Sequence, residues 1–90
     1  MTADGPWHIV IEENIGSGEN RQWRPSGAHP AGDRETARAA ALHAARSHRP
    51  RHPMTEQDRQ VFRVSEDSYV VLVQGMTGTY HFRVSVGELV

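Results

Sequence analysis

The sequence predicts a small α+β domain: a mostly antiparallel sheet of about four strands with one helix packed on one face. Three observations support this. The 90 residues are the length of one domain. An alanine-rich stretch at 34–47 favours a helix. Residues 60–86 have the pattern of two consecutive hairpins, with three strand-like segments separated by two short turns. The predicted element order is therefore β-α-β-β-β within a single domain spanning 1–90.

The chain begins with a polar stretch, 1–6, that we expect to be frayed. Residues 7–12 predict a strand, because Trp7, Ile9 and Ile11 fall on one face of an extended chain. This strand would join an edge of the sheet, or pair with residues 60–65 after a helical crossover. A parallel, adjacent pair of that kind would require a right-handed crossover.

Residues 14–32 are expected to form an irregular loop. Gly16-Ser17-Gly18 indicates a turn, and the prolines and glycines from 25 to 32 argue against a regular element. A short return strand near 21–24 would make a hairpin with the first strand. Within it, Trp23 either caps one edge of the core or offers a stacking platform to a ligand.

The helix is predicted from Arg34 to about Ser47. Asp33 is a candidate N-cap, and Pro50 ends the helix. Small residues would let the helix approach a sheet closely while burying little area. The inward stripe is expected to hold five alanines flanked by Leu42, namely Ala37, Ala40, Ala41, Ala44 and Ala45.

The last three strands, 60–65, 69–74 and 79–86, predict an antiparallel meander, because the turns between them are too short for crossovers. The third alternates cleanly, with the side chains from Tyr80 to Val86 at even positions facing inward. Residues 69–74 are apolar on both faces, which predicts a central strand. We expect Val70 and Leu72 to point inward from it.

Composition excludes several classes of function. The chain has no cysteine, which removes disulfides, thiolate catalysis and cysteine-ligated metals. It has no apolar run near the ~18 residues of a membrane helix, and its start is unlike a signal peptide. We therefore expect a cytoplasmic protein with no membrane contact and no cofactor. No catalytic constellation is apparent, so an enzyme is not expected.

Charge is unevenly distributed, although the net charge is only −1. Residues 21–53 hold seven arginines against two acids, and the whole chain has ten arginines and no lysine. With this arginine bias, the segment 49–53 and the ending 80–90 make the chain resemble short uncharacterised proteins of Streptomyces-type actinobacteria. The resemblance implies no activity, and it allows the arginines to reflect genome composition.

The face of the sheet opposite the helix is the first candidate site. One helix covers one side only, so the other side would expose a partly apolar strip. A second copy, another protein or a small ligand would cover it, unless Trp7, Trp23 and the 14–32 loop do so within the monomer. The strip predicted as a dimer or partner interface comprises Val61, Arg63, Tyr69, Val71, Val73, His81 and Arg83.

The basic segment 46–53 is the alternative site, for an anion or a nucleic acid. Arg46, Arg49 and Arg51 would bind phosphate oxygens, helped by Arg63 and Arg83. The C-terminal end of a helix is, however, the wrong end of its dipole for a phosphate. The predicted α-β-β-β run is part of the double-stranded-RNA-binding arrangement, but the terminal second helix of that arrangement is missing here.

Six histidines are the third feature, at positions 8, 29, 43, 48, 52 and 81. His48 and His52 are four apart, but Pro50 between them prevents the one-face geometry of a helical pair. We expect dispersed surface histidines and no metal site.

Overall fold

A computed structural model describes residues 5–15, 22–50, 55–76 and 78–90. Its elements, in chain order, are β1 (Trp7–Ile15), β2 (Gln22–Gly32), α1 (Arg34–Ser47), β3 (Glu56–Ser65), β4 (Ser68–Gly75) and β5 (Thr79–Glu88). The predicted frayed start (apart from residues 5 and 6), the Gly16–Gly18 turn, and Arg51 with His52 lie outside the described residues. No described helix is both long and apolar enough to cross a membrane.

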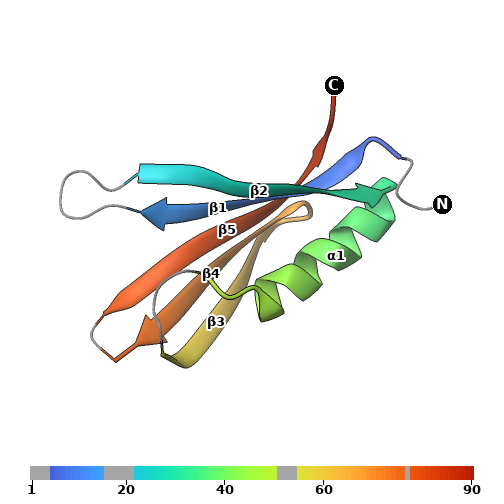
Figure 1. The fold of residues 1–90 in the computed structure, drawn as a ribbon. Helices are drawn as coiled ribbons and strands as arrows, with labels where there is room; N and C mark the ends of the chain where they lie inside the picture. Colours follow the sequence, from blue (N-terminus) through green and yellow to red (C-terminus); the bar gives the residue numbers. More distant parts are fainter. Residues whose placement is uncertain (1–4, 16–21, 51–54, 77) are drawn as a thin grey trace.

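The five strands form one antiparallel sheet in the order β2-β1-β5-β4-β3, and α1 lies across one face of it (Figure 1). The predicted α+β class, the mostly antiparallel sheet and one helix on one face are confirmed for the described residues. The described sheet has five strands, which are the four expected and the additional strand that was predicted near 21–24 as a hairpin partner of the first strand. That strand is β2, which is longer than predicted and lies at the edge opposite β3.

The expectation of an irregular loop over 14–32 is wrong for residues 22–32, which are the strand β2. β2 pairs with β1 along its length, from Ile15↔Gln22 to Trp7↔Gly32, with two register shifts. Pro25 and Pro30 fit there because β2 is an edge strand, where the missing N–H groups need no partner. The glycines and prolines thus indicate an irregular edge strand and not the absence of a strand.

β1 is not an edge strand and does not pair with β3. It lies between β2 and β5 and is antiparallel to both. The hairpin with β2 occupies its outer side, and the pairs Ile9↔Val86 and Ile11↔Val84 join it to the last strand of the chain. The first and last strands therefore meet at the centre of the sheet.

The core lies between α1 and the sheet. Ala37, Ala41 and Ala45 are fully buried, while Ala40, Leu42 and Ala44 of the predicted stripe are partly buried. On the sheet side the largest fully buried side chains are Phe82, Val84, Val71 and Val73. Methyl-sized helix side chains let α1 sit close over these larger residues, so the sheet supplies most of the buried area.

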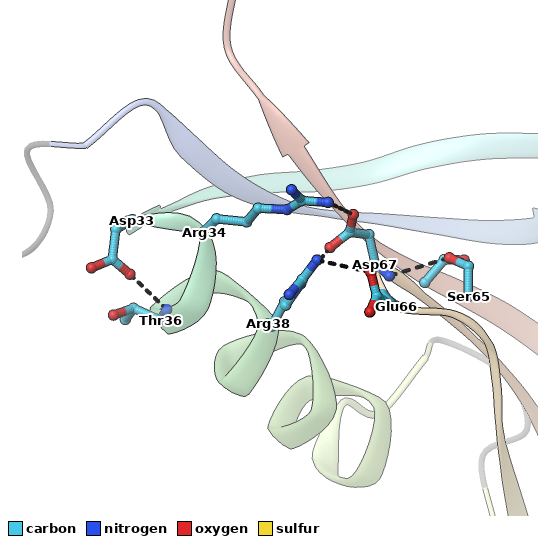
Figure 2. A network of polar contacts seen from close by, with 8 residues as sticks. Asp33, Arg34, Thr36, Arg38, Ser65, Glu66 and Asp67 are labelled. Carbon is cyan, nitrogen blue, oxygen red and sulfur yellow. Dashed lines mark hydrogen bonds and ion pairs between the residues drawn. The ribbon is translucent and has the colours of Figure 1, made fainter.

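Ion pairs connect the N-terminal end of α1 to the β3–β4 turn (Figure 2). Asp33 is the N-cap, as predicted, and accepts a hydrogen bond of 2.7 Å from the Thr36 backbone N–H. Arg34 and Arg38 donate to the two carboxylate oxygens of Asp67 at 2.6 and 2.7 Å. These two hydrogen bonds lower the pKa of Asp67 from 3.8 to about 2.

Candidate interaction surface

Strand register assigns each side chain to one face of the sheet, because directly paired residues share a face. Val71 pairs with Phe82 and Val73 with Tyr80, and Phe82 is buried beneath α1. The covered face is therefore the face of Phe82. The opposite face, which we call the open face, carries the residues of the alternate pairs Phe62↔Val70, Gln60↔Leu72, Leu72↔His81, Val70↔Arg83, Glu12↔Arg83 and Val10↔Ser85.

The predicted interface residues are divided between the two faces. His81 and Arg83 lie on the open face, as expected. The other five lie on the covered face, because the odd-numbered side chains of β4 point toward the helix, and not the even-numbered ones as predicted. These five are Val61, Arg63, Tyr69, Val71 and Val73. Tyr69, Val71 and Val73 are buried in the core. They are corrected from interface residues to core residues.

The register of the β4–β5 hairpin is the signal that would have assigned the phase correctly. Only four residues, 75–78, separate Gln74 from Thr79, and those two residues are paired. Counting back from the turn places Val73 opposite Tyr80 and Val71 opposite Phe82. Since β5 alternates without ambiguity, the face of its partner strand follows from the turn length.

Where β2, β1 and β5 lie side by side, side chains of the open face pack on one another. The guanidinium of Arg83 lies 4.4 Å from the centre of the Trp23 ring, and its Nε donates to Glu12 Oε1 at 2.9 Å. His81 meets the same ring edge-on, with centroids 5.0 Å apart. Trp23 therefore packs on the open face, in a cation–π contact with Arg83, and does not cap the edge of the core. Trp7 lies beside Arg34 instead.

The part of the open face on β3 and β4 carries a small apolar patch next to Gln60. Phe62 is 46% exposed and its partner Val70 is half-buried. Leu72, two positions further along β4, is also half-buried. Val64, where the register with β4 shifts, is 58% exposed. Phe62 was overlooked as a site residue because the phase error placed it on the covered face.

The basic segment follows α1, and the structure describes only part of it. Arg46 and Arg49 are exposed. They line a recess of about 390 Å³ together with Ser47, Glu56, Gln57 and Arg59. The two proposed helpers lie elsewhere, because Arg83 is on the open face and Arg63 stacks over Tyr69, 5.9 Å from the ring centre. Arg59, which the sequence did not single out, is the additional arginine of this recess.

Arg59 closes the C-terminal end of α1. Its guanidinium donates to the backbone oxygens of Ala45 and His48 at 3.0 and 2.7 Å, and to the two carboxylate oxygens of Glu56 at 2.8 and 2.9 Å. The hydrogen bond from Arg59 is the main cause of a lowered Glu56 pKa, and the charge of Arg49 adds to it against the effect of burial. The end of the helix is thus satisfied by a cation from β3.

The described histidines do not converge on one another. His48 contacts Glu13 through Nε2 at 3.1 Å and meets the Phe82 ring edge-on, whereas His8 contacts the backbone of Pro6. Among the described residues, no three His, Cys, Asp or Glu side chains are placed to hold a metal ion. Comparison of the chain with protein-family models, with characterised proteins and with solved structures gave no match.

Proposed function

We propose that this chain is a non-enzymatic protein-interaction module that self-associates through the open face of its sheet. The observation that carries the proposal is the apolar patch on that face. There a phenylalanine is nearly half exposed beside two half-buried aliphatic side chains, Val70 and Leu72. None of the three carries a charge that a second copy would have to desolvate.

A second copy of the chain suits this surface because the same patch on two molecules is self-complementary around a two-fold axis. The cluster of Trp23, His81 and Arg83 would supply a polar rim on one side, and Phe62, Val70 and Leu72 would supply the apolar part beside it. This arrangement of centre and rim is typical of protein interfaces. The proposed interface is redefined as Phe62, Val70 and Leu72, with His81 and Arg83 at the rim.

The size of the molecule limits the strength of the association. The described structure has an accessible surface of 6040 Å². A standard interface covers roughly a tenth of a small protein's surface, which is about 600 Å² for each copy here. That area lies at the lower end of specific interfaces, and association has its own entropic cost. We therefore expect a dimer with a dissociation constant in the micromolar range.

Sedimentation across the micromolar range tests the proposal. Phe62→Lys should weaken the dimer by at least about 10-fold, because it places two like charges at the centre of the interface. Leu89→Ser is the matched control, since Leu89 is a 70% exposed apolar residue beyond the end of β5. A wild-type chain that stays monomeric at every concentration, or a control as damaging as Phe62→Lys, would show the proposal to be wrong.

A further inference from the structure

A second, independent surface lies at the opposite end of α1 from the network in Figure 2. The chain leaves the helix at Ser47 and returns as β3 from Glu56. Between these two elements is the recess of about 390 Å³ described above. Among the described residues its lining holds three arginines, Arg46, Arg49 and Arg59, against one carboxylate, Glu56, so that these residues carry a formal charge of +2.

The two remaining positive charges belong to Arg46 and Arg49. The charge of Arg59 is balanced by Glu56, to which it donates two hydrogen bonds, and its side chain is only 11% exposed. Arg46 and Arg49 are exposed, and no carboxylate in the described part of the chain lies within ion-pair distance of either. Two such guanidinium groups beside one hollow provide donors for a doubly charged oxyanion.

The helix dipole would ordinarily oppose an anion at this end, because the last carbonyl groups carry partial negative charge. Here Arg59 donates to the carbonyl oxygen of Ala45 in the last turn and to that of His48, the C-cap residue. The carbonyl oxygen of Ala44 accepts from the His48 backbone N–H at 2.7 Å. Two of the last four carbonyl groups of α1 are therefore engaged by donors of the protein itself, which reduces the repulsion of an anion at this end.

We propose that this recess binds the phosphate group of a small phosphate monoester. Arg46 and Arg49 would donate hydrogen bonds to its oxygens, and Arg59, paired with Glu56, holds the end of α1 against the start of β3 beside the recess. A nucleic-acid backbone fits less well, because the lining residues that the structure describes include no aromatic side chain for a base to stack on and the chain carries a net charge of −1. The volume is at the lower end of small-molecule sites.

Titration of the 15N-labelled chain with inorganic phosphate and with a mononucleotide, at constant ionic strength, tests the site. We expect saturable shifts of the amides at 46–49 and 56–59, with a dissociation constant of about 1 mM or below. Arg46→Gln with Arg49→Gln should weaken binding at least about 10-fold while the melting temperature is unchanged. Arg24→Gln is the matched control, because Arg24 is an exposed arginine of β2.

Three results would overturn the proposal. One is the absence of saturable shifts with both probes. Another is an equal loss of binding in Arg24→Gln, which would mean that any surface arginine suffices. The third is tighter binding of an oligonucleotide than of the mononucleotide, with a steep dependence on salt, which would identify a nucleic-acid surface instead. None of these results depends on whether the chain dimerises.

Discussion

The two faces of the sheet differ in what covers them. On the covered face, Val71, Val73, Phe82 and Val84 are fully buried beneath α1. On the open face, no strand residue that the structure describes is buried. Both faces carry apolar side chains, so composition alone does not distinguish them. The comparison teaches that the helix-covered face holds the fold together and leaves the other face available for contacts between molecules.

The largest loss of stability is expected from a substitution of Phe82, on the covered face. Its ring is fully buried and contacts His48 edge-on, with Arg59 over it at 5.5 Å. Phe82→Ala should reduce the free energy of unfolding by about 3–5 kcal/mol, because it removes a large apolar group and leaves a cavity. Urea unfolding followed by circular dichroism measures the change. A loss no greater than that of an exposed substitution would contradict the assignment of this face as the core.

Because α1 lies close to the sheet, we also expect that enlarging a buried helix residue destabilises the protein. Ala41 is fully buried against the sheet, and a larger side chain has no room there. Ala41→Leu should cost about 1–3 kcal/mol through overpacking, despite the good helix propensity of leucine. Ala39→Leu, on the exposed side of the same helix, is the control and should leave the urea midpoint nearly unchanged. Equal effects of the two substitutions would mean that the helix is not closely packed.

The charge network at the start of α1 predicts a smaller effect that depends on pH. The pKa of Asp67 is lowered from 3.8 to about 2 by hydrogen bonds from Arg34 and Arg38. Its contribution to stability is therefore fully present above pH 3.8, decreases below it and is lost as the pH falls through about 2. Asp67→Asn should flatten the stability profile in that window, as measured by thermal unfolding.

The control for this network is Glu88→Gln, which removes an exposed carboxylate at the end of β5. It should retain the wild-type decrease of stability between pH 4 and about 2. High salt should reduce the difference between wild type and Asp67→Asn, because the ion pairs are partly exposed. An Asp67→Asn profile that coincides with that of wild type would contradict the role given to this network.

The open face predicts the smallest effect on stability. Phe62→Ser should reduce the free energy of unfolding by only about 1 kcal/mol in a chain kept monomeric by dilution, because Phe62 is 46% exposed and only part of its ring area is buried. The same variant should sediment as a weaker dimer than wild type. Chemical denaturation at low concentration, together with sedimentation at high concentration, separates the two effects. A loss of stability approaching that of Phe82→Ala would remove the distinction between the faces.

Val71→Lys and Val73→Lys would test the interface predicted from the sequence, but the structure shows why these variants are unsuitable. Both residues are fully buried beneath α1, so a lysine at either position would bury an unpaired charge and unfold the domain. Loss of a dimer in such a variant would report on folding and not on an interface. The error came from one strand, whose two faces are equally apolar.

The sequence by itself determined the elements whose signals are local. The Asp33 cap and the alanine-rich run specified α1, and strict alternation specified β5 and its inward face. Hydrogen bonds within one turn of helix and a period of two along a strand are properties of neighbouring residues, so a linear sequence records them. The order of helix and strands from α1 onward followed from the same signals.

The tertiary structure alone decided the features that depend on distant partners. Pro25 and Pro30 are compatible with β2 only because β1 pairs with its inner side and its other side is an edge. Arg59 caps α1 because β3 brings its guanidinium within hydrogen-bonding distance of Ala45 and His48, and Trp23 packs on the open face because β5 presents Arg83 there. These contacts join residues separated by 11 to 60 positions, and their energies arise from packing and charge that no local pattern encodes.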